Sequence, residues 1–307
     1  MSANITFLTP GNKGNNLGIL KRSIVADIRA DHIRSLAFLS PNLNNSKVVQ
    51  GKEDFTLENF YDWFRGFTDA EGSFQITYLR DNFWRFSFEI KLHIDDIKVL
   101  HFIKDTLGIG KVYESEKSCR FIVSKQSEIK KILDIFTNYP LISSKRLNLL
   151  TWDKAFKLYI DGKDTKESTF SRIKNLKDEM NNNRTDFTSN HPININSYWL
   201  LGFVEGDGSW IVDKKNYSLI FSIAQSAKDL ELMNAIKFYI NNLNSQFKDI
   251  VSLGTYQEGS LSSMVNLTIT KTDAISQVIV PLFFNMIWFS KKEMDFADWV
   301  YILARSA

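Results

Sequence analysis

Residues 64–72 read FRGFTDAEG, and residues 200–208 read LLGFVEGDG. Both stretches carry glycine at their third and ninth positions and an acid at their sixth and eighth positions. Further matches follow in the same order: Phe88–Ile90 with Phe221–Ile223, Asp96 with Asp229, Phe121–Lys125 with Leu267–Lys271, Pro140 with Pro281, Lys145 with Lys292, and Trp152 with Trp299. A shared order of matches indicates two copies of one unit of roughly 100 residues.

Hydrophobic periodicity predicts the elements of the first copy. Residues 59–70 and 94–107 have helical spacing, and Gly72 is expected to end the first helix in the left-handed conformation. Apolar and polar residues alternate in the segments predicted as strands, which are 73–78 and 85–90 around a turn at 81–82, and then 111–115 and 119–123. The predicted fold class is therefore α+β, with two αββαββα units that each carry a four-stranded antiparallel sheet.

Each motif helix carries a stripe of small residues. Gly66 and Ala70 are four residues apart, as are Gly202 and Gly206. Residues four apart lie on one face of a helix, one turn from each other. We therefore predict that the two helices pair through these faces, backbone against backbone.

Both motif helices end in acids. A helix C-terminus carries partial negative charge, so carboxylates are disfavoured there and Lys or Arg is the ordinary choice. Pairing of the helices would bring Glu71 and Asp207 close together, where a divalent cation is the natural partner. The alternative is that these acids are simply solvated at the helix ends.

Composition bounds the remaining possibilities. The chain has 307 residues, of which 44% are hydrophobic and 24% charged, so it can bury a large core. No apolar run approaches the ~18–20 residues that cross a bilayer, so we expect no membrane partner. Cys119 is the one cysteine, which excludes an internal disulfide and a thiolate-cluster metal site. A metal ion would therefore be held by carboxylate oxygens.

The charge is divided unevenly along the chain. Residues 1–53 hold seven Lys and Arg against three acids, a net of +4, which leaves −1 of the overall +3 for residues 54–307. Binding of nucleic acid by this body would require cations concentrated on one face. Composition and hydrophobic pattern together predict four segments: a loosely ordered N-terminal extension (1–57), a first unit (58–160), a polar linker (161–195) and a second unit (196–307). The linker is expected to contain a helical piece near 171–180.

The repeated motif, in its hairpin and helix context, resembles the LAGLIDADG homing endonucleases in their single-chain, two-motif form encoded by organellar introns. The resemblance implies that the motif helices form a pseudo-twofold interface and that the two sheets form saddles over double-stranded DNA. It also implies that Glu71 and Asp207, at the eighth motif position, bind the catalytic metal. The expected metal is Mg²⁺ or Mn²⁺, with Ca²⁺ supporting binding without cleavage, in a mitochondrial monomer.

Three further residues receive catalytic roles from this resemblance. Lys145 and Lys292 precede the last helix of each unit, where basic active-site residues are expected to steady the phosphate or the departing oxygen. Gln225 resembles the glutamine that organises water, but the first copy has Leu92 at the aligned position. The two pockets are therefore expected to differ. The sixth-position acids, Asp69 and Glu205, are expected to be structural, as caps of the partner helix.

Recognition of DNA is expected on the polar faces of the strands, because Arg, Gln, Asn and Ser read base edges in the major groove. The predicted DNA-binding residues are Gln75, Thr77, Arg85, Ser87, Glu89, Lys111, Tyr113, Ser115, Arg120, Asp213, Lys215, Ser218, Ser222, Thr255, Asn266 and Thr268.

The predicted activity is single-step, metal-assisted hydrolysis of one phosphodiester bond in each DNA strand. Two alternatives remain open at this point. One is an RNA-binding maturase that assists its host intron, and the other is a DNA-binding relative that has lost catalysis.

Overall fold

The computed structural model describes residues 55–80, 83–161, 166–180, 184–188, 191–258 and 262–306. The predicted N-terminal extension (1–57) and the turn at 81–82 therefore lie largely outside the described residues. The first motif helix begins at Leu57, within the segment assigned to the extension. Within the described residues, no helix is both long and apolar enough to span a bilayer.

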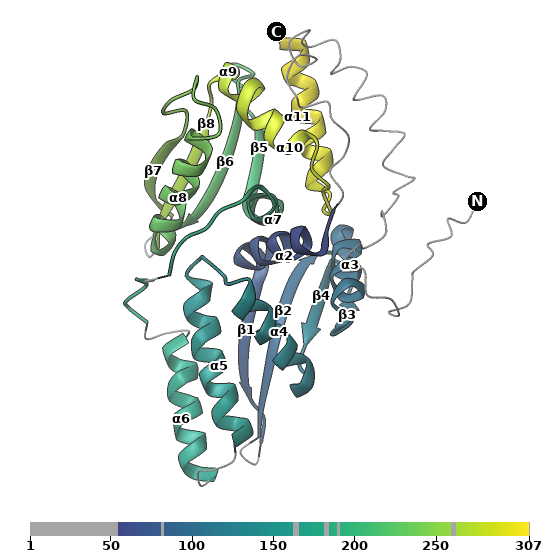
Figure 1. The fold of residues 1–307 in the computed structure, drawn as a ribbon, viewed down its shortest axis with the longest axis vertical. Coiled ribbons are helices and arrows are strands. Elements are labelled where there is room, and N and C mark those ends of the chain that lie inside the picture. The colour runs from purple at the N-terminus through teal and green to yellow at the C-terminus, as the bar shows by residue number, and fades with distance from the viewer. Residues whose placement is uncertain are drawn as a thin grey trace, which may run out of the picture.

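Two units of the same topology make up the described chain (Figure 1). The first contains α2 (Leu57–Glu71), β1 (Gly72–Tyr78), β2 (Trp84–His93), α3 (Ile97–Leu107), β3 (Lys111–Glu114), β4 (Ser118–Val123), α4 (Gln126–Asn138) and α5 (Lys145–Asp161). The second contains α7 (Ser197–Asp207), β5 (Gly208–Val212), β6 (Leu219–Ser226), α8 (Leu230–Asn241), β7 (Ser252–Glu258), β8 (Ser262–Ile269), α9 (Thr272–Ala274), a π-helical turn (Ile275–Ile279), α10 (Val280–Phe284) and α11 (Lys292–Ser306).

Each unit carries one four-stranded antiparallel sheet. The strand orders are β1-β2-β4-β3 and β5-β6-β8-β7, so the central pair of each sheet joins the two hairpins. Helices cover one face of each sheet, and the indole of the final helix donates to the first strand in both units: Trp152 to the carbonyl of Gln75 and Trp299 to that of Ile211, both at 3.0 Å. The predicted α+β class and repeated unit are confirmed.

The motif helices α2 and α7 form the centre of the molecule, with the two sheets on opposite sides of the pair (Figure 1). A Cβ on Gly66 would lie 2.0 Å from the carbonyl oxygen of Trp199, and one on Gly202 would lie 2.1 Å from that of Trp63. Any side chain at either glycine would force the backbones apart. The absence of side chains thus permits direct contact between the helix backbones.

The end of α2 differs from the prediction. Gly72 has φ −71° and ψ 148°, which is extended rather than left-handed, and it is the first residue of β1. Space explains the glycine, since a Cβ there would lie 2.5 Å from Cγ2 of Thr68. The helix therefore passes directly into the strand, which fixes Glu71 at the junction.

The linker between the units contains α6 (Lys166–Asp178), which lies beside α5 (Figure 1). Its Phe170 packs against Tyr78 and Trp84, at ring-centroid distances of 5.2 and 5.4 Å. Those two residues end β1 and begin β2, so the linker supports the far end of the first hairpin. Sequence periodicity placed this helix several residues too late.

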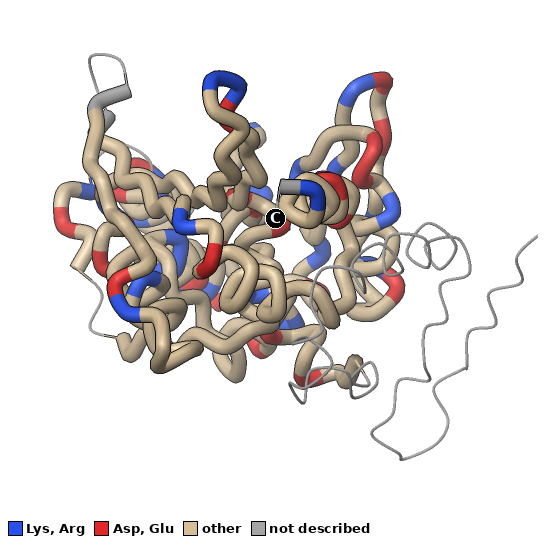
Figure 2. Tube along the Cα trace, turned by 90° about the horizontal axis from the view of Figure 1, so that it is seen from above, with Lys and Arg blue, Asp and Glu red and all other residues tan. Residues whose placement is uncertain are grey.

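Lysine and arginine are interspersed with aspartate and glutamate along the described chain (Figure 2). Binding of a polyanion by this body would therefore depend on individual lysines and arginines placed among acids.

Candidate active site at the paired helix ends

Glu71 and Asp207 are the last residues of α2 and α7, and both side chains are partly buried. Glu71 lies against the bare backbone of α7: a Cβ on Gly206 would lie 3.1 Å from Cγ of Glu71 and 3.4 Å from its Oε1. Because Gly206 immediately precedes Asp207, the contact brings the two carboxyl-bearing helix ends together.

The two carboxyl groups resist ionisation. Burial raises the pKa of Glu71, Lys145 and Lys292 lower it, and Asp96 adds to the rise. Burial also raises the pKa of Asp207, to about 6, with Lys145 lowering it and the neighbouring Glu71 raising it. Two neighbouring acids whose charged forms are disfavoured by burial are typical of a site that receives a cation.

Lys145 and Lys292 reach into this site from the first residues of α5 and α11. Nζ of Lys145 donates to the carbonyl of Ala70, and Nζ of Lys292 donates to the carbonyls of Gly206 and, at 2.7 Å, Gly208. The last turns of α2 and α7 therefore receive from neighbouring helices the cations that their own sequences lack. Burial lowers the pKa of both lysines, against the opposing pull of Asp207 and Glu71.

The sixth-position acids are buried and fully engaged. Asp69 accepts from the backbone N–H groups of Ile142 and Ser143, at 3.2 and 3.0 Å, and from the Trp199 indole at 2.9 Å. Glu205 accepts from the N–H groups of Phe289 and Ser290, both at 2.7 Å, and from the Trp63 indole.

These contacts correct one expectation. The backbone donors to Asp69 and Glu205 belong to the loop before the last helix of the same unit, and the partner motif helix supplies only the indole. Desolvation raises the pKa of both acids despite their hydrogen bonds. Their role in the structure is to hold α5 and α11 against the motif helices.

The glutamine is present on one side only. Nε2 of Gln225 donates to Oδ2 of Asp207 at 2.5 Å. Gln225 and Leu92 occupy equivalent places, because Gly208 pairs with Ile223 as Gly72 pairs with Ile90. Leu92 has no polar side-chain atom to offer Glu71, so the two halves of the site differ chemically.

The residues present fit a divalent cation. Two carboxylates converge, yet the described residues contain no cluster of three or more His, Cys, Asp or Glu that could enclose an ion. Mg²⁺ is commonly held by one or two carboxylates, with water and substrate phosphate oxygens completing its shell. Glu71 and Asp207 would thus hold such an ion only in part, leaving positions for a substrate.

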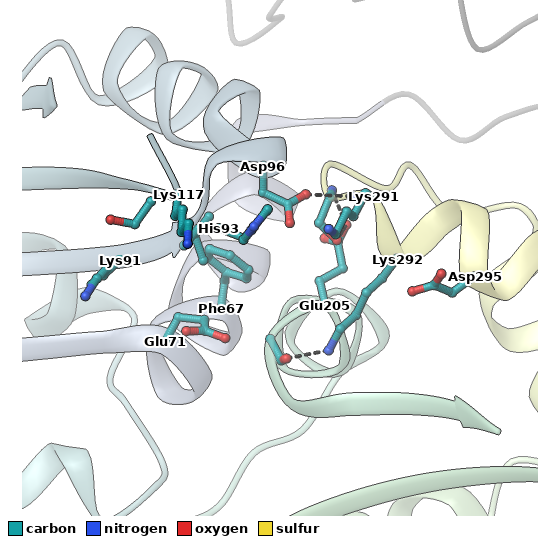
Figure 3. A pocket seen from close by; sticks show the side chains of 14 residues that line it. Phe67, Glu71, Lys91, His93, Asp96, Lys117, Glu205, Lys291, Lys292 and Asp295 are labelled. Atoms are coloured by element: carbon teal, nitrogen blue, oxygen red, sulfur yellow. Dashed lines mark hydrogen bonds between the residues drawn. The ribbon is translucent and has the colours of Figure 1, made fainter. Parts of the chain in front are cut away.

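A pocket of about 440 Å³ opens beside this site (Figure 3). Glu71 from α2, Lys292 from α11 and Asp96 from the turn before α3 line it, together with Lys91 of β2. The carboxylate end of α2 is therefore accessible from the space between the two units.

The strand register places the predicted recognition residues in three groups. Eleven lie on the sheet faces opposite the helices: Gln75, Thr77, Arg85, Ser87, Glu89, Lys111, Tyr113, Arg120, Ser222, Asn266 and Thr268. Four lie in turns rather than in strands: Ser115, Asp213, Lys215 and Ser218. Thr255 pairs with the fully buried Val265 and so points to the helix-covered side, because opposed residues in antiparallel strands share a face.

Three residues on the open faces are buried despite their polarity. Ser87 and Glu89 are 6% and 9% exposed, and Glu89 is within 3.4 Å of the Gln75 amide. Ser222, 6% exposed, donates to Asn266 at 2.7 Å. These side chains pack at the centre of each sheet face, whereas Arg85 and Arg120 are exposed, with Arg120 in an ion pair to Glu89 at 3.7 Å.

Sequence reasoning missed two sets of residues. Lys91 faces Arg120 across the strands and extends the row of cations on the open face; alternation through Glu89 would have identified it. Asp96 and Asp229 were matched in the repeat without a role, and both prove to contact the opposite unit.

Comparison with known families gives one match, to the LAGLIDADG endonuclease model, over residues 64–156 and 200–303. The chain is 27% identical over 280 residues to the uncharacterized mitochondrial protein RF1 of Saccharomyces cerevisiae, covering 84% of the chain and 59% of that protein. It is 28% identical over 197 residues to the probable intron-encoded endonuclease Cox1-I1b of Schizosaccharomyces pombe, covering 60% and 50%. The chain thus spans little more than half the length of these relatives.

Solved structures share the architecture. The LAGLIDADG homing endonuclease I-GzeII in complex with its DNA target superposes with a TM-score of 0.68 at 26% identity, covering 79% of this chain and 89% of that one. I-SmaMI bound to uncleaved DNA in the presence of calcium ions gives a TM-score of 0.67 at 22% identity, covering 79% and 90%.

Proposed function

The chain belongs to the LAGLIDADG endonuclease family, and from that premise we propose that it is a site-specific, divalent-metal-dependent endonuclease that hydrolyses one phosphodiester bond in each strand of double-stranded DNA. The observation that carries the proposal is the convergence of Glu71 and Asp207 with Lys145 and Lys292 at the paired helix ends. A protein without catalytic function would gain nothing from two carboxyl groups whose pKa values burial raises at the same helix ends.

The residues divide the chemistry among them. Glu71 and Asp207 would hold Mg²⁺ or Mn²⁺, which when bound lowers the pKa of water and offsets charge on the phosphate. Lys145 and Lys292 place positive charge beside the carboxylates, where they can stabilise a phosphate oxygen in the transition state. Gln225, already bonded to Asp207, can orient a water molecule on its side.

Single-step hydrolysis is favoured over a covalent intermediate. The one cysteine, Cys119, is fully buried in β4 and is remote in sequence from both motifs. The carboxylate pair supplies no nucleophile with an adjacent base of the Ser–His or Cys–His type. The attacking group is therefore water, activated at the helix ends.

The target should be long and asymmetric. A seven-residue strand such as β1 spans roughly 23 Å at ~3.3 Å per residue, or about seven base pairs at ~3.4 Å each. The two sheets present different side chains on their open faces, including Arg85 and Arg120 in the first and Asn266 and Thr268 in the second. Two unlike faces read two unlike half-sites, so a monomer suffices.

Cellular context comes from the relatives. The mitochondrial protein RF1 and the probable intron-encoded endonuclease Cox1-I1b support a mitochondrial, intron-encoded origin for this chain. Ca²⁺ is expected to support DNA binding without cleavage, in keeping with the crystallisation of I-SmaMI on uncleaved DNA with calcium ions.

A cleavage selection tests the proposal. Purified protein is incubated with a randomised duplex library in Mg²⁺, in Ca²⁺, and with Glu71→Gln in Mg²⁺ as the matched control. We expect one long, asymmetric cut sequence with wild type in Mg²⁺ only, and retained binding by Glu71→Gln. Enrichment by binding without cutting would instead indicate a DNA-binding regulator, and no DNA enrichment would favour a maturase that binds the host intron RNA.

A further inference from the structure

The start of the last helix in each unit is held by an acid from the other unit. In the first unit, Ser144 donates to Asp229: its backbone N–H to Oδ1 at 2.6 Å and its hydroxyl to Oδ2 at 2.9 Å. In the second unit, the backbone N–H of Lys291 donates to Oδ1 of Asp96 at 2.8 Å (Figure 3). The helices α5 and α11 begin one residue after these donors.

The exchange is reciprocal. Asp96 and Asp229 each end a 3₁₀ turn, Ile94–Asp96 and Ala227–Asp229, that follows the second strand of its unit. They are also matched positions of the sequence repeat. One acid in each copy therefore has the same task, and in both copies it acts across the interface.

The site lysines are the residues next to these contacts. Lys145 follows Ser144 and donates to the end of α2, while Lys292 follows Lys291 and donates to the end of α7. The loop before each lysine is held on one side by the motif acid of its own unit, Asp69 or Glu205. The cross-unit acid completes the constraint at the residue that adjoins the lysine.

We propose that Asp229 and Asp96 are positioning residues for Lys145 and Lys292, so that each unit's lysine is aimed by the other unit. The inference rests on the proposed function for its catalytic consequence, although the positioning itself is independent of it. Effective catalysis requires charged groups to be held near the productive geometry, and a displacement of about 1 Å can reduce a rate by about 100-fold.

A general role in holding the units together does not account for these contacts. The interface is already made by the backbone contact of α2 with α7 at Gly66 and Gly202. The contacts of the two acids also differ. Asp229 is 6% exposed and accepts two hydrogen bonds from Ser144, whereas Asp96 is half-buried and accepts one from Lys291. Loss of Asp229 is therefore expected to have the larger effect.

The first test measures lysine accessibility without any DNA. Wild type, Asp229→Ala and Asp96→Ala are briefly labelled with acetic anhydride, and labelling at each lysine is read by mass spectrometry against the exposed lysines of the same chain. We expect labelling to rise several-fold at Lys145 alone in Asp229→Ala, and at Lys292 alone in Asp96→Ala. Equal labelling of both lysines in either variant, or no change, would overturn the inference whether or not the protein cleaves DNA.

The second test uses a cleaved duplex whose strands carry different dyes, in single-turnover reactions. Asp229→Ala should slow cleavage of the same strand as Lys145→Met, and Asp96→Ala should slow cleavage of the same strand as Lys292→Met. We expect each rate to fall on the order of 10- to 100-fold. Binding in Ca²⁺ should stay within about twofold of wild type. If a folded Asp229→Ala protein cuts both strands equally slowly, the positioning role is refuted and the proposed function stands. If the wild-type protein never cuts DNA, the proposed function alone is refuted.

Matched variants separate position from charge. Asp229→Asn can keep both bonds, because its amide oxygen accepts from the Ser144 N–H and its amide nitrogen donates to the hydroxyl; it should restore most of the rate. Asp95→Ala removes the exposed ion pair to Nζ of Lys291, 2.8 Å away, and leaves the backbone contact, so it should behave as wild type. If Asp229→Ala fails to fold, Ser144→Ala removes one of the two bonds and should show the same strand preference in weaker form.

Discussion

Replacing Asp207 by asparagine should make the protein more stable at neutral pH while it removes the metal ligand. The pKa of Asp207 is raised from 3.8 to about 6, so its ionised form is less favourable in the folded chain than in the unfolded one. That penalty is complete above about pH 6 and vanishes as the pH falls toward 3.8. An uncharged isostere avoids it at every pH.

The size of the effect follows from the shift. At 1.36 kcal/mol per pKa unit, the difference between 3.8 and about 6 corresponds to about 3 kcal/mol. Asp207 is partly exposed, and solvent screening reduces this to a gain of about 1–2 kcal/mol. For a folded body of this size, the Tm should rise by about 2–8 °C.

The assay is thermal unfolding of wild type and Asp207→Asn in EDTA at pH 7.5, 6.0 and 4.5. The gain should be largest at pH 7.5 and mostly lost at pH 4.5, where the wild-type carboxyl group is protonated. Asp298→Asn, at an exposed position on α11, controls for loss of one negative charge. A variant less stable than wild type at pH 7.5, or a gain that does not change with pH, would refute the account of this carboxyl group.

Three further predictions concern the interface, the motif acids and the asymmetry. Gly66→Ala should destabilise the protein by about 3 kcal/mol or more in denaturant titrations, because the added Cβ would lie 2.0 Å from a backbone oxygen. Gly254→Ala is the control and should be nearly neutral, because its added Cβ would meet no non-neighbouring residue within 4 Å. Asp69→Ala should lower the free energy of unfolding by about 2–4 kcal/mol by leaving buried donors unpaired, and a loss below 0.5 kcal/mol would contradict that role. Gln225→Leu should slow one DNA strand selectively in a two-dye nicking assay; equal slowing of both strands would show that the glutamine does not serve one half-site.

Much of the fold could be predicted because its signals are local and repeated. Alternation in β2 and helical spacing in α3 each report on burial within one element, and the second copy corroborates the first. The conformation of Gly72 could not be predicted in this way. A glycine after a helix fits a left-handed turn and a crowded junction equally well, and the choice depends on Thr68, which packs there only in the folded structure.

The site residues likewise differ in how well local sequence patterns predict them. Glu71 and Asp207 stand out because acids at a helix C-terminus break a local rule. The polar strand faces were inferred from alternation, which fails where a strand ends early or changes phase, as at Asp213 and Thr255. The bond between Ser144 and Asp229 spans 85 residues and two units, and no periodicity reports on it.

The acids at the ends of α2 and α7 add negative charge where the helix dipole is already negative, and lysines from other helices offset this charge. A lysine within α2 or α7 would satisfy the terminal carbonyls but would occupy the position that the carboxylate needs. Supplying the cation from α5 and α11 leaves the helix ends negative and adjacent, at the price of holding two loops in place. That task falls to Asp69 and Glu205 within each unit and to the reciprocal acids between units, and so two copies of one short unit make a site that neither copy could make alone.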